Sequence, residues 1–259
     1  MQIPYVNAKK SLGQNFMISD KVLSAEAAHA TGKNVLEIGA GYGALTEKLC
    51  KEAKKVIAVE IDKDLCTMLK SNVTSKKLKI LNKDFFKATD SELELPTIDI
   101  VIANIPYMLS SSVIEWLYTH KIQAVLCVQK EFAERMLAAP GSSQYSNLSV
   151  MTSLTFSITE IMEVQSTCFF PKPKVDSIVV YLKPRDFSIE DKVSDVISAL
   201  MQHKRKKFRA ALVAAHRTLH ISKDQATQIA EQLGIEKRVV KMEPEEILNS
   251  AKNICGVIS

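Results

Sequence analysis

Three glycines and a glutamate form the first group of residues whose types and spacing could do chemistry. Gly39, Gly41 and Gly43 follow the apolar run "VLEI" and open the segment "ALTEKL". Glycine is needed where the backbone turns tightly and a ligand approaches without a Cβ in the way. Glu60 ends the next apolar run, "VIAVE", about twenty residues after the first glycine. A carboxylate at this position accepts hydrogen bonds from both hydroxyls of a ribose. The spacing predicts a cofactor that contains adenosine, and NAD and S-adenosylmethionine both satisfy it.

Two further strand ends carry polar side chains. "ILNKDFF" leads to Asp84, whose carboxylate could accept a hydrogen bond from an adenine amine, with Phe85 beside the ring. A turn or a helix cap is the plainer interpretation of such an aspartate. "VIAN" ends at Asn104, whose amide needs a partner at the edge of a core. For Asn104 too, a helix cap is the alternative.

The segment Asn104-Ile105-Pro106-Tyr107 contains the groups needed to activate an aromatic amine. An adenine amine is a poor nucleophile because its lone pair is delocalised into the ring. If the Asn104 side-chain oxygen and the Ile105 carbonyl both accept its hydrogens, the lone pair is freed without a strong general base. Pro106 would stiffen this loop, and Tyr107 would stack on the base. This interpretation expects the Asn104 amide to lack a partner in the protein alone.

Short, β-branched apolar runs alternate with helical segments from residue 34 onward. Strands are predicted at 34–39, 55–61, 78–84, 97–104 and 124–129, with helices at 44–53, 64–73 and 111–120. This order predicts βαβ units and a doubly wound α/β domain with a parallel sheet. The strand ends described above would then lie along the carboxyl edge of the sheet, where such folds bind ligands.

The second half of the chain changes from strands to helices. Helices are predicted at 130–140 and 146–156, and a closing pair of strands, one of them antiparallel, at 158–164 and 175–183. Beyond "LKPRD" only helical patterns continue, with breaks near Gly234 and Pro244. We expect one domain over residues 1–185 and a small helical domain over residues 186–259. Ser110, Ser111 and Ser112 are expected to cap the helix that follows them.

Composition limits the class of protein. The chain has 259 residues, 46% of them hydrophobic and 24% charged, which is typical of a globular protein with one large domain or with one large and one small domain. No apolar run approaches the roughly 18 to 20 residues that span a bilayer, and the first residues lack a signal-peptide pattern. We therefore expect a cytoplasmic protein without a membrane partner. The five cysteines and five histidines show no ligand spacing, so reduced thiols and no metal are expected.

The motifs occur together in an order that resembles one family. "KKSLGQNFMIS", "VLEIGAGYGALTEKL", "VIAVEID", "NKDFF", "ANIPYMLSS", "VQKEFAERMLAAPGSSQYSNLSV" and "CFFPKPKVDSIVV" resemble the KsgA/Dim-type ribosomal RNA adenine dimethyltransferases over essentially the whole chain. The resemblance implies a Rossmann-like, mostly parallel, seven-stranded methyltransferase sheet with a small C-terminal all-helical domain. It also implies S-adenosylmethionine as the cofactor.

The resemblance further implies the site residues and the substrate. The cofactor site would be lined by Asn15, Met17, Gly39, Gly41, Glu60, Ile61, Asp84, Phe85 and Asn104. Asn104, Ile105, Pro106 and Tyr107 would present the adenine, with Phe169 closing its other face. The alternative is a surface turn with one of the two phenylalanines, Phe169 or Phe170, in the core. The implied substrate is two adjacent adenosines, each dimethylated at N6, in the 3′-terminal hairpin loop of small-subunit ribosomal RNA within a pre-ribosomal particle. A monomer is expected.

A basic segment in the helical region is the candidate contact for RNA. "HKRKKFRAALVAAHR" contains no acidic residue, and its candidate phosphate contacts are Lys204, Arg205, Lys206, Lys207 and Arg209. Read as a helix, it has an apolar face from Phe208 to Leu219 and leaves most basic side chains free for phosphates. A solvated helix face is the plainer interpretation, and the net charge of +5 is weak support by itself. Lys9, Lys10, Lys172 and Lys174 would extend this basic surface.

Three other functions explain parts of the sequence. The nearest is an Erm-like methyltransferase of large-subunit ribosomal RNA, although "PKPKVDS" and "KKFRAAL" favour the small-subunit enzyme. A non-catalytic RNA-binding assembly or transcription factor on the same fold is disfavoured, because Gly39, Glu60, Asp84, Asn104 and Tyr107 are all present. An NAD-dependent dehydrogenase would explain the glycine loop and none of the later motifs.

Overall fold

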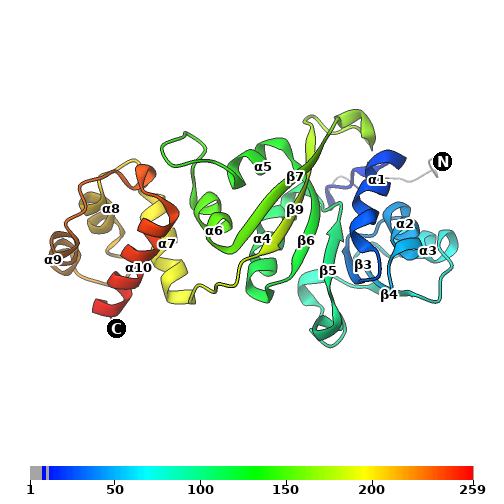
Figure 1. The fold of residues 1–259 in the computed structure, drawn as a ribbon, viewed down its shortest axis with the longest axis horizontal. Coiled ribbons are helices and arrows are strands. Elements are labelled where there is room, and N and C mark those ends of the chain that lie inside the picture. Colours follow the sequence, from blue (N-terminus) through cyan, green and yellow to red (C-terminus); the bar gives the residue numbers. More distant parts are fainter. Residues whose placement is uncertain (1–7, 10–11, 259) are drawn as a thin grey trace. The chain divides into compact units, whose positions relative to one another are not determined.

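A computed structural model describes residues 8–9 and 12–258. Within these residues one seven-stranded sheet has the strand order β4-β3-β2-β5-β6-β9-β7 (Figure 1). The bounds are β2 Asn34–Ile38, β3 Lys55–Glu60, β4 Leu78–Asn82, β5 Ile100–Ala103, β6 Gln123–Gln129, β7 Phe156–Val164 and β9 Ser177–Pro184. The order reverses between β2 and β5, and this switch point is where doubly wound folds bind ligands.

The sheet is parallel over its first five strands. β2 pairs in parallel with β3 and with β5, β3 pairs with β4, and β5 pairs with β6, whereas β9 runs antiparallel to β6. Val35, Leu36 and Ile102 are fully buried, as in sheets that are covered on both faces. The doubly wound, mostly parallel sheet predicted from the sequence is confirmed.

Five α-helices of the described chain lie in or begin in the part that holds this sheet. They are α1 Asp20–Ala27, α2 Ala44–Glu52, α3 Lys63–Asn72, α4 Ser110–His120 and α5 Lys130–Met136. α2 packs against β3, α3 against β3 and β4, α4 against β6, and α1 against α2. α1 has no counterpart among the predicted elements. A separate antiparallel ladder joins two short strands, β1 (Phe16–Met17) and β8 (Phe169–Phe170).

The prediction that Ser110 to Ser112 cap α4 is wrong. α4 begins at Ser110, and its N-cap residue is Leu109, which has helical dihedral angles and makes no side-chain cap hydrogen bond. The cause is a single 3₁₀ turn over Tyr107–Leu109 that runs directly into α4. No extended residue therefore separates the loop from the helix, and an N-cap side chain requires one.

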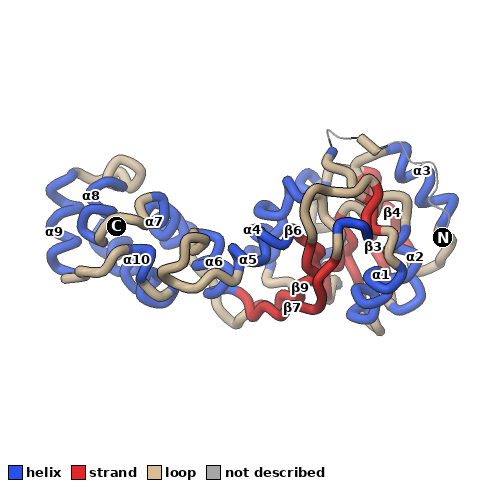
Figure 2. Tube along the Cα trace, turned by 90° about the horizontal axis from the view of Figure 1, so that it is seen from above, coloured by secondary structure: helices blue, strands red, loops and turns tan. Residues whose placement is uncertain are grey.

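The chain divides into two compact units. One contains the sheet and extends to Ala133, with Ile158–Pro184, and the other contains Glu134–Ser157 and Arg185 onward. The second unit holds α6 Asn147–Thr155, α7 Asp191–Gln202, α8 Phe208–Ala215, α9 Lys223–Leu233 and α10 Pro244–Ile258. From α7 to α10 it contains helices and loops only (Figure 2).

Residues 134–157 belong to the helical unit, although a single boundary at residue 185 would assign them to the sheet domain. The fully buried Tyr145 donates its hydroxyl hydrogen to the Met242 carbonyl at 3.0 Å, and the Gly141 amide donates to the Val240 carbonyl at 2.6 Å. α6 also packs against α7 and α10. These contacts bridge about a hundred residues of sequence, which local patterns do not reveal.

We predict that Gly43→Ala lowers the free energy of unfolding more than Gly32→Ala does. Both glycines have a left-handed φ, +100° and +72°, and a Cβ there costs about 1 to 2 kcal/mol. A Cβ at Gly43 would also lie 2.6 Å from Leu69 Cδ1 and 2.9 Å from Val73 Cγ2, whereas nothing lies within 4 Å of one at Gly32. Urea unfolding followed by circular dichroism measures the difference, and equal losses would contradict the clash.

Candidate functional site

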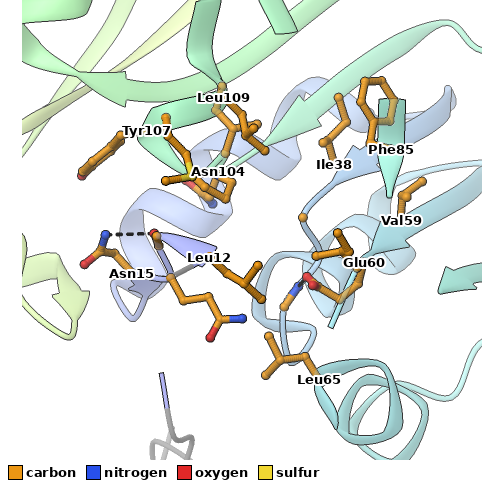
Figure 3. Close-up of a pocket in the computed structure, with 18 of the residues that line it drawn as sticks. Leu12, Asn15, Ile38, Val59, Glu60, Leu65, Phe85, Asn104, Tyr107 and Leu109 are labelled. Carbon is orange, nitrogen blue, oxygen red and sulfur yellow. Dashed lines mark hydrogen bonds between the residues drawn. The ribbon is translucent and has the colours of Figure 1, made fainter. Parts of the chain in front are cut away.

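A pocket lies at the carboxyl ends of β2, β3 and β5. Of the predicted site residues, the following line it: Asn15, Gly39, Gly41, Glu60, Ile61, Asp84, Phe85, Asn104, Ile105, Pro106, Tyr107 and Phe169. Figure 3 shows Glu60 and Phe85 on one side, Asn15 and Tyr107 on the other, and Asn104 between them. Met17 lines a smaller adjoining cavity instead, together with Glu37 and Asn104. The structure thus brings the predicted cofactor and adenine residues together.

The glycine loop is held against the end of β3 by backbone hydrogen bonds. The Gly39 and Ala40 amides both donate to the Val59 carbonyl, at 2.8 and 3.1 Å. The Gly41 amide donates to Glu60 Oε2 at 2.8 Å, and the Asp62 amide donates to Glu60 Oε1, also at 2.8 Å. Burial raises the pKa of Glu60, and these two amides oppose that rise. Each oxygen keeps acceptor capacity for a further donor, as a ribose diol requires.

The segment before β1 is tied to the same region. Lys9 Nζ lies 2.8 Å from Asp62 Oδ1 and 2.9 Å from Asp64 Oδ2, and Gln14 Nε2 donates to Asp62 Oδ2 at 3.1 Å. The hydrogen bonds to Asp62 and Asp64 raise the pKa of Lys9. Lys9 is therefore engaged with carboxylates beside the cofactor pocket. Lys10, the other predicted extension of the basic surface at this end, lies outside the described residues.

Asp84 caps a turn, as the plainer interpretation expects, and it also lines the pocket. Its Oδ1 accepts from the Phe86 amide at 3.1 Å and so caps a 3₁₀ turn over Phe85–Lys87. The same half-buried side chain lines the pocket. Phe85 is buried beside it, edge-on to Trp116 with 4.9 Å between ring centroids. The cap fixes the direction of the carboxylate and leaves Oδ2 available to a ligand, with Lys87 Nζ 3.8 Å away.

The structure agrees with the expectation for the oxygen of the Asn104 amide and contradicts it for the nitrogen. Its Oδ1 is buried and has no hydrogen-bond partner among residues 8–9 and 12–258. Its Nδ2, however, donates to Glu26 Oε2 at 3.0 Å, so the expectation of an amide without any partner is wrong. Glu26 lies on α1, 78 residues away in sequence, and no pattern around Asn104 indicates it. The amide thus has its donor end satisfied and its acceptor end open.

The two aromatic residues are positioned by β9 and by the β1–β8 ladder. The Tyr107 hydroxyl lies 2.8 Å from the hydroxyl of Ser177, the first residue of β9. Phe169 pairs with Met17 across the ladder and is 5% exposed, whereas Phe170 is 43% exposed. Phe169 therefore both packs in the core and lines the pocket.

Two buried glutamates were not found from the sequence. Glu26 and Glu37 are almost inaccessible, and burial raises the pKa of each to about 8. The Thr46 hydroxyl donates to Glu37 Oε2 at 2.6 Å, and Glu37 lines the smaller cavity beside the pocket. A glutamate inside the apolar strand "VLEI" was the one signal available, because charged residues are almost never fully buried without a reason.

The basic segment forms only part of the helix that was predicted: Phe208, Leu212 and Ala215 lie on its buried face, but the basic residues before Phe208 are not helical. α8 covers only Phe208–Ala215, and Lys204 to Lys207 lie in the turn before it. Lys204 donates to the carbonyl oxygens of Ser143 and Tyr145, and burial lowers its pKa. It holds the loop before α6 and is not free for phosphate.

The remaining basic side chains of the predicted RNA contact are exposed: Arg205, Lys206, Lys207 and Arg209. Lys207 lies 3.2 Å from Glu236, and Arg209 lies 2.9 Å from Glu231. Exposed pairs of this kind are weak, so both can exchange their carboxylates for phosphates. Lys172 and Lys174 are exposed in the loop after β8.

Comparison with known proteins decides the family. The model of the family described as ribosomal RNA adenine dimethylase matches residues 5–255. The chain belongs to this family. The protein is therefore an S-adenosylmethionine-dependent ribosomal RNA adenine methyltransferase. Its site fits that cofactor, because the glycine loop, the buried Glu60 carboxylate and the Asp84 carboxylate line one pocket.

Curated relatives of this methyltransferase cover most of its length. A "Probable ribosomal RNA small subunit methyltransferase A" of Thermococcus onnurineus is 35% identical over 93% of this chain and 90% of the relative. A "Ribosomal RNA small subunit methyltransferase A" of Mycoplasmopsis pulmonis is 37% identical over 78% and 82%.

Solved structures are similar over the same extent. A dimethyladenosine transferase from Plasmodium falciparum is 31% identical, with a TM-score of 0.77 over 91% of this chain and 95% of the other. The 23S rRNA methyltransferase ErmE is 23% identical, with a TM-score of 0.63 over 93% and 99%, which shows the shared fold.

Two kinds of feature are absent from the described residues. No group of three or more histidine, cysteine, aspartate or glutamate side chains there could hold a metal ion. Among the same residues, none of the helices combines the length and apolar character that a membrane span requires.

We predict that Glu37→Gln flattens the pH dependence of stability. Because the pKa of Glu37 rises from 4.5 to about 8 on folding, the folded state binds more protons than the unfolded chain between these values. Its contribution is complete below pH 4.5 and is lost as the pH rises through about 8, at about 1.4 kcal/mol per pH unit. Urea unfolding from pH 5 to 9 measures the slope. Replacing the exposed Glu131 by Gln is the control, and an unchanged slope in Glu37→Gln would contradict the prediction.

Proposed function

We propose that this methyltransferase dimethylates the N6 amines of two adjacent adenosines in the 3′-terminal hairpin loop of small-subunit ribosomal RNA. The observation that carries the proposal is the buried Oδ1 of Asn104, an acceptor without a partner among the described residues, in the wall of the pocket. A buried acceptor is costly unless a ligand supplies the donor. The small-subunit relatives support the choice of RNA.

The loop after β5 would activate the adenine amine. Asn104 Oδ1 and the Ile105 carbonyl would accept its two hydrogens and draw its lone pair out of the ring. Both acceptors are held in place before the substrate arrives, so the stabilisation requires little rearrangement. Pro106 restricts the backbone between them and Tyr107. No strong general base is needed, because the nitrogen would become acidic only once its bond to the methyl carbon has formed and the carbon–sulfur bond has broken, and its proton would then pass to solvent.

The opposite side of the pocket would hold the cofactor. When bound, S-adenosylmethionine supplies a methyl group on a positively charged sulfur. Glu60 would accept hydrogen bonds from the ribose hydroxyls. Asp84 would accept a hydrogen bond from the adenine amine of the cofactor, beside Phe85. Asn15 and Ile61 line the same pocket. Glu37, in the smaller cavity, provides a carboxylate for an ammonium group.

The target base must leave its stack to reach this pocket. Tyr107 and Phe169 offer it aromatic faces, and stacking on such faces is worth about 1–3 kcal/mol per base. The Tyr107 hydroxyl is already held by Ser177, so little side-chain freedom remains to be lost. We propose that the substrate is a pre-ribosomal small-subunit particle in the cytoplasm and that the enzyme acts as a monomer.

We predict that labelled S-adenosylmethionine marks two adjacent adenosines near the 3′ end of the RNA in unmethylated small subunits. Primer extension locates them. Asn104→Ala should lower the rate by at least about 10²-fold while binding of S-adenosylmethionine, followed by calorimetry, is only weakened.

The matched control is Asn147→Ala, which removes another buried amide oxygen without a partner in the described chain and does not line the pocket. It should leave the rate near that of the wild type. Label in large-subunit RNA would favour the Erm-like alternative, and RNA binding without label would favour a non-catalytic factor. A wild-type rate in Asn104→Ala would contradict the role of Asn104.

We predict that replacing Arg205, Lys206 and Lys207 together by glutamine weakens binding to small-subunit RNA and flattens its salt dependence. Each lost phosphate contact should reduce the slope of log K against log salt by about 0.7 to 0.9. Lys204→Gln alone should leave the slope unchanged, because the Lys204 ammonium is bound to carbonyl oxygens. Filter binding at several salt concentrations measures both. An unchanged slope in the triple variant would mean that this turn is a solvated surface that makes no phosphate contacts.

A further inference from the structure

One hydrogen bond joins Glu26 to Asn104, and each of these side chains also has an oxygen that is buried without a partner in the described chain. Asn104 Nδ2 donates to Glu26 Oε2 at 3.0 Å. The other oxygen of each group, Glu26 Oε1 and Asn104 Oδ1, is buried without a partner among the same residues. Glu26 is inaccessible on the buried face of α1. None of the roles assigned above uses it.

An asparagine amide has two different ends, and only one of them suits an amine substrate. Its oxygen accepts hydrogens and its nitrogen donates them. If Nδ2 faced the amine, its N–H groups would either oppose the N–H groups of the amine or donate to the amine lone pair, which would then be unavailable for methyl transfer. A carboxylate is an acceptor only, so it attracts Nδ2 and repels Oδ1. An ionised Glu26 therefore allows one orientation of the Asn104 amide, with Oδ1 left for the substrate.

The surroundings of Glu26 provide no compensating cation among the described residues that interact with it. Glu37 on β2 and Cys127 on β6 interact with it electrostatically, and both would carry negative charge if ionised. On α2, which packs against α1, Lys48 is paired with Asp20 at the exposed start of α1. Burial consequently raises the pKa of Glu26 to about 8, and the Asn104 hydrogen bond opposes the rise.

We infer that Glu26 is a positioning residue for methyl transfer, whose carboxylate holds the Asn104 amide with Oδ1 toward the substrate amine. This inference rests on the proposed function of Asn104. When Glu26 is protonated, it gains an O–H donor that can also satisfy a flipped amide, and the orientation is no longer unique. The rate should therefore rise with pH as Glu26 ionises.

Glu26→Gln tests the inference with a side chain of the same shape. Glutamine has a donor and an acceptor, so it mimics the protonated acid at every pH. We expect kcat to rise with pH between about 7 and 9 in the wild type and to stay at the lower value in Glu26→Gln, about tenfold below the wild type at pH 9. Binding of S-adenosylmethionine should change little, because Glu26 does not line the pocket. Glu131→Gln, an exposed change of the same charge, should keep the rise.

A second measurement needs no RNA and no activity. In the free protein, the side-chain ¹⁵N resonance of Asn104 should shift with pH as Glu26 ionises, and this titration should be absent in Glu26→Gln. The inference fails if the wild-type resonance does not titrate, or if Glu26→Gln keeps the wild-type rate and pH profile. A wild type that methylates no ribosomal RNA overturns the proposed function instead, and the titration then decides whether Glu26 orients Asn104.

Discussion

Parallel pairing of β2 with both β3 and β5 is the constraint on which the pocket depends. It places the glycine loop, Glu60 and Asn104 at one edge of the sheet, although they are up to 65 residues apart. Hydrogen bonds then fix each group locally: the Gly41 amide holds Glu60, and Glu26 holds Asn104. A shift of one residue in either register would turn every side chain of the shifted strand to the other face. The chemistry therefore follows from strand register before it follows from any single side chain.

Those parts of the structure that depend on local patterns could be predicted from the sequence. β-branched runs gave the strands, and the spacing from Gly39 to Glu60 and from Asp84 to Asn104 gave the strand ends. α1 was not predicted because it is short and carries Glu26 on its buried face, which interrupts the apolar pattern. The partner of Asn104 and the carbonyls that bind Lys204 escaped for another reason. Both contacts join distant segments, and no periodicity in either segment specifies the other.

The two buried glutamates show how a binding site differs from an ordinary core. Removing a carboxylate from water without a cation is costly. The raised pKa values of Glu26 and Glu37 beside the pocket reflect that cost. A core built for stability alone would place apolar groups there. Instead the interior keeps Glu37, which lines the smaller cavity, and Glu26, which binds the Asn104 amide in the wall of the pocket. These buried carboxyl groups therefore lower the stability of the empty protein, but they orient polar groups toward a bound ligand.

The assignment of residues 134–157 to the helical unit has a consequence for dissecting the protein. A fragment that ends at residue 184 keeps this segment but loses Met242 and Val240, which bind Tyr145 and Gly141. It also exposes the buried side chains of α6 that pack against α7 and α10. Newly exposed apolar surface of this kind favours aggregation. The sheet and the helices are thus distinct in packing but interleaved in sequence, and one cut in the chain does not separate them.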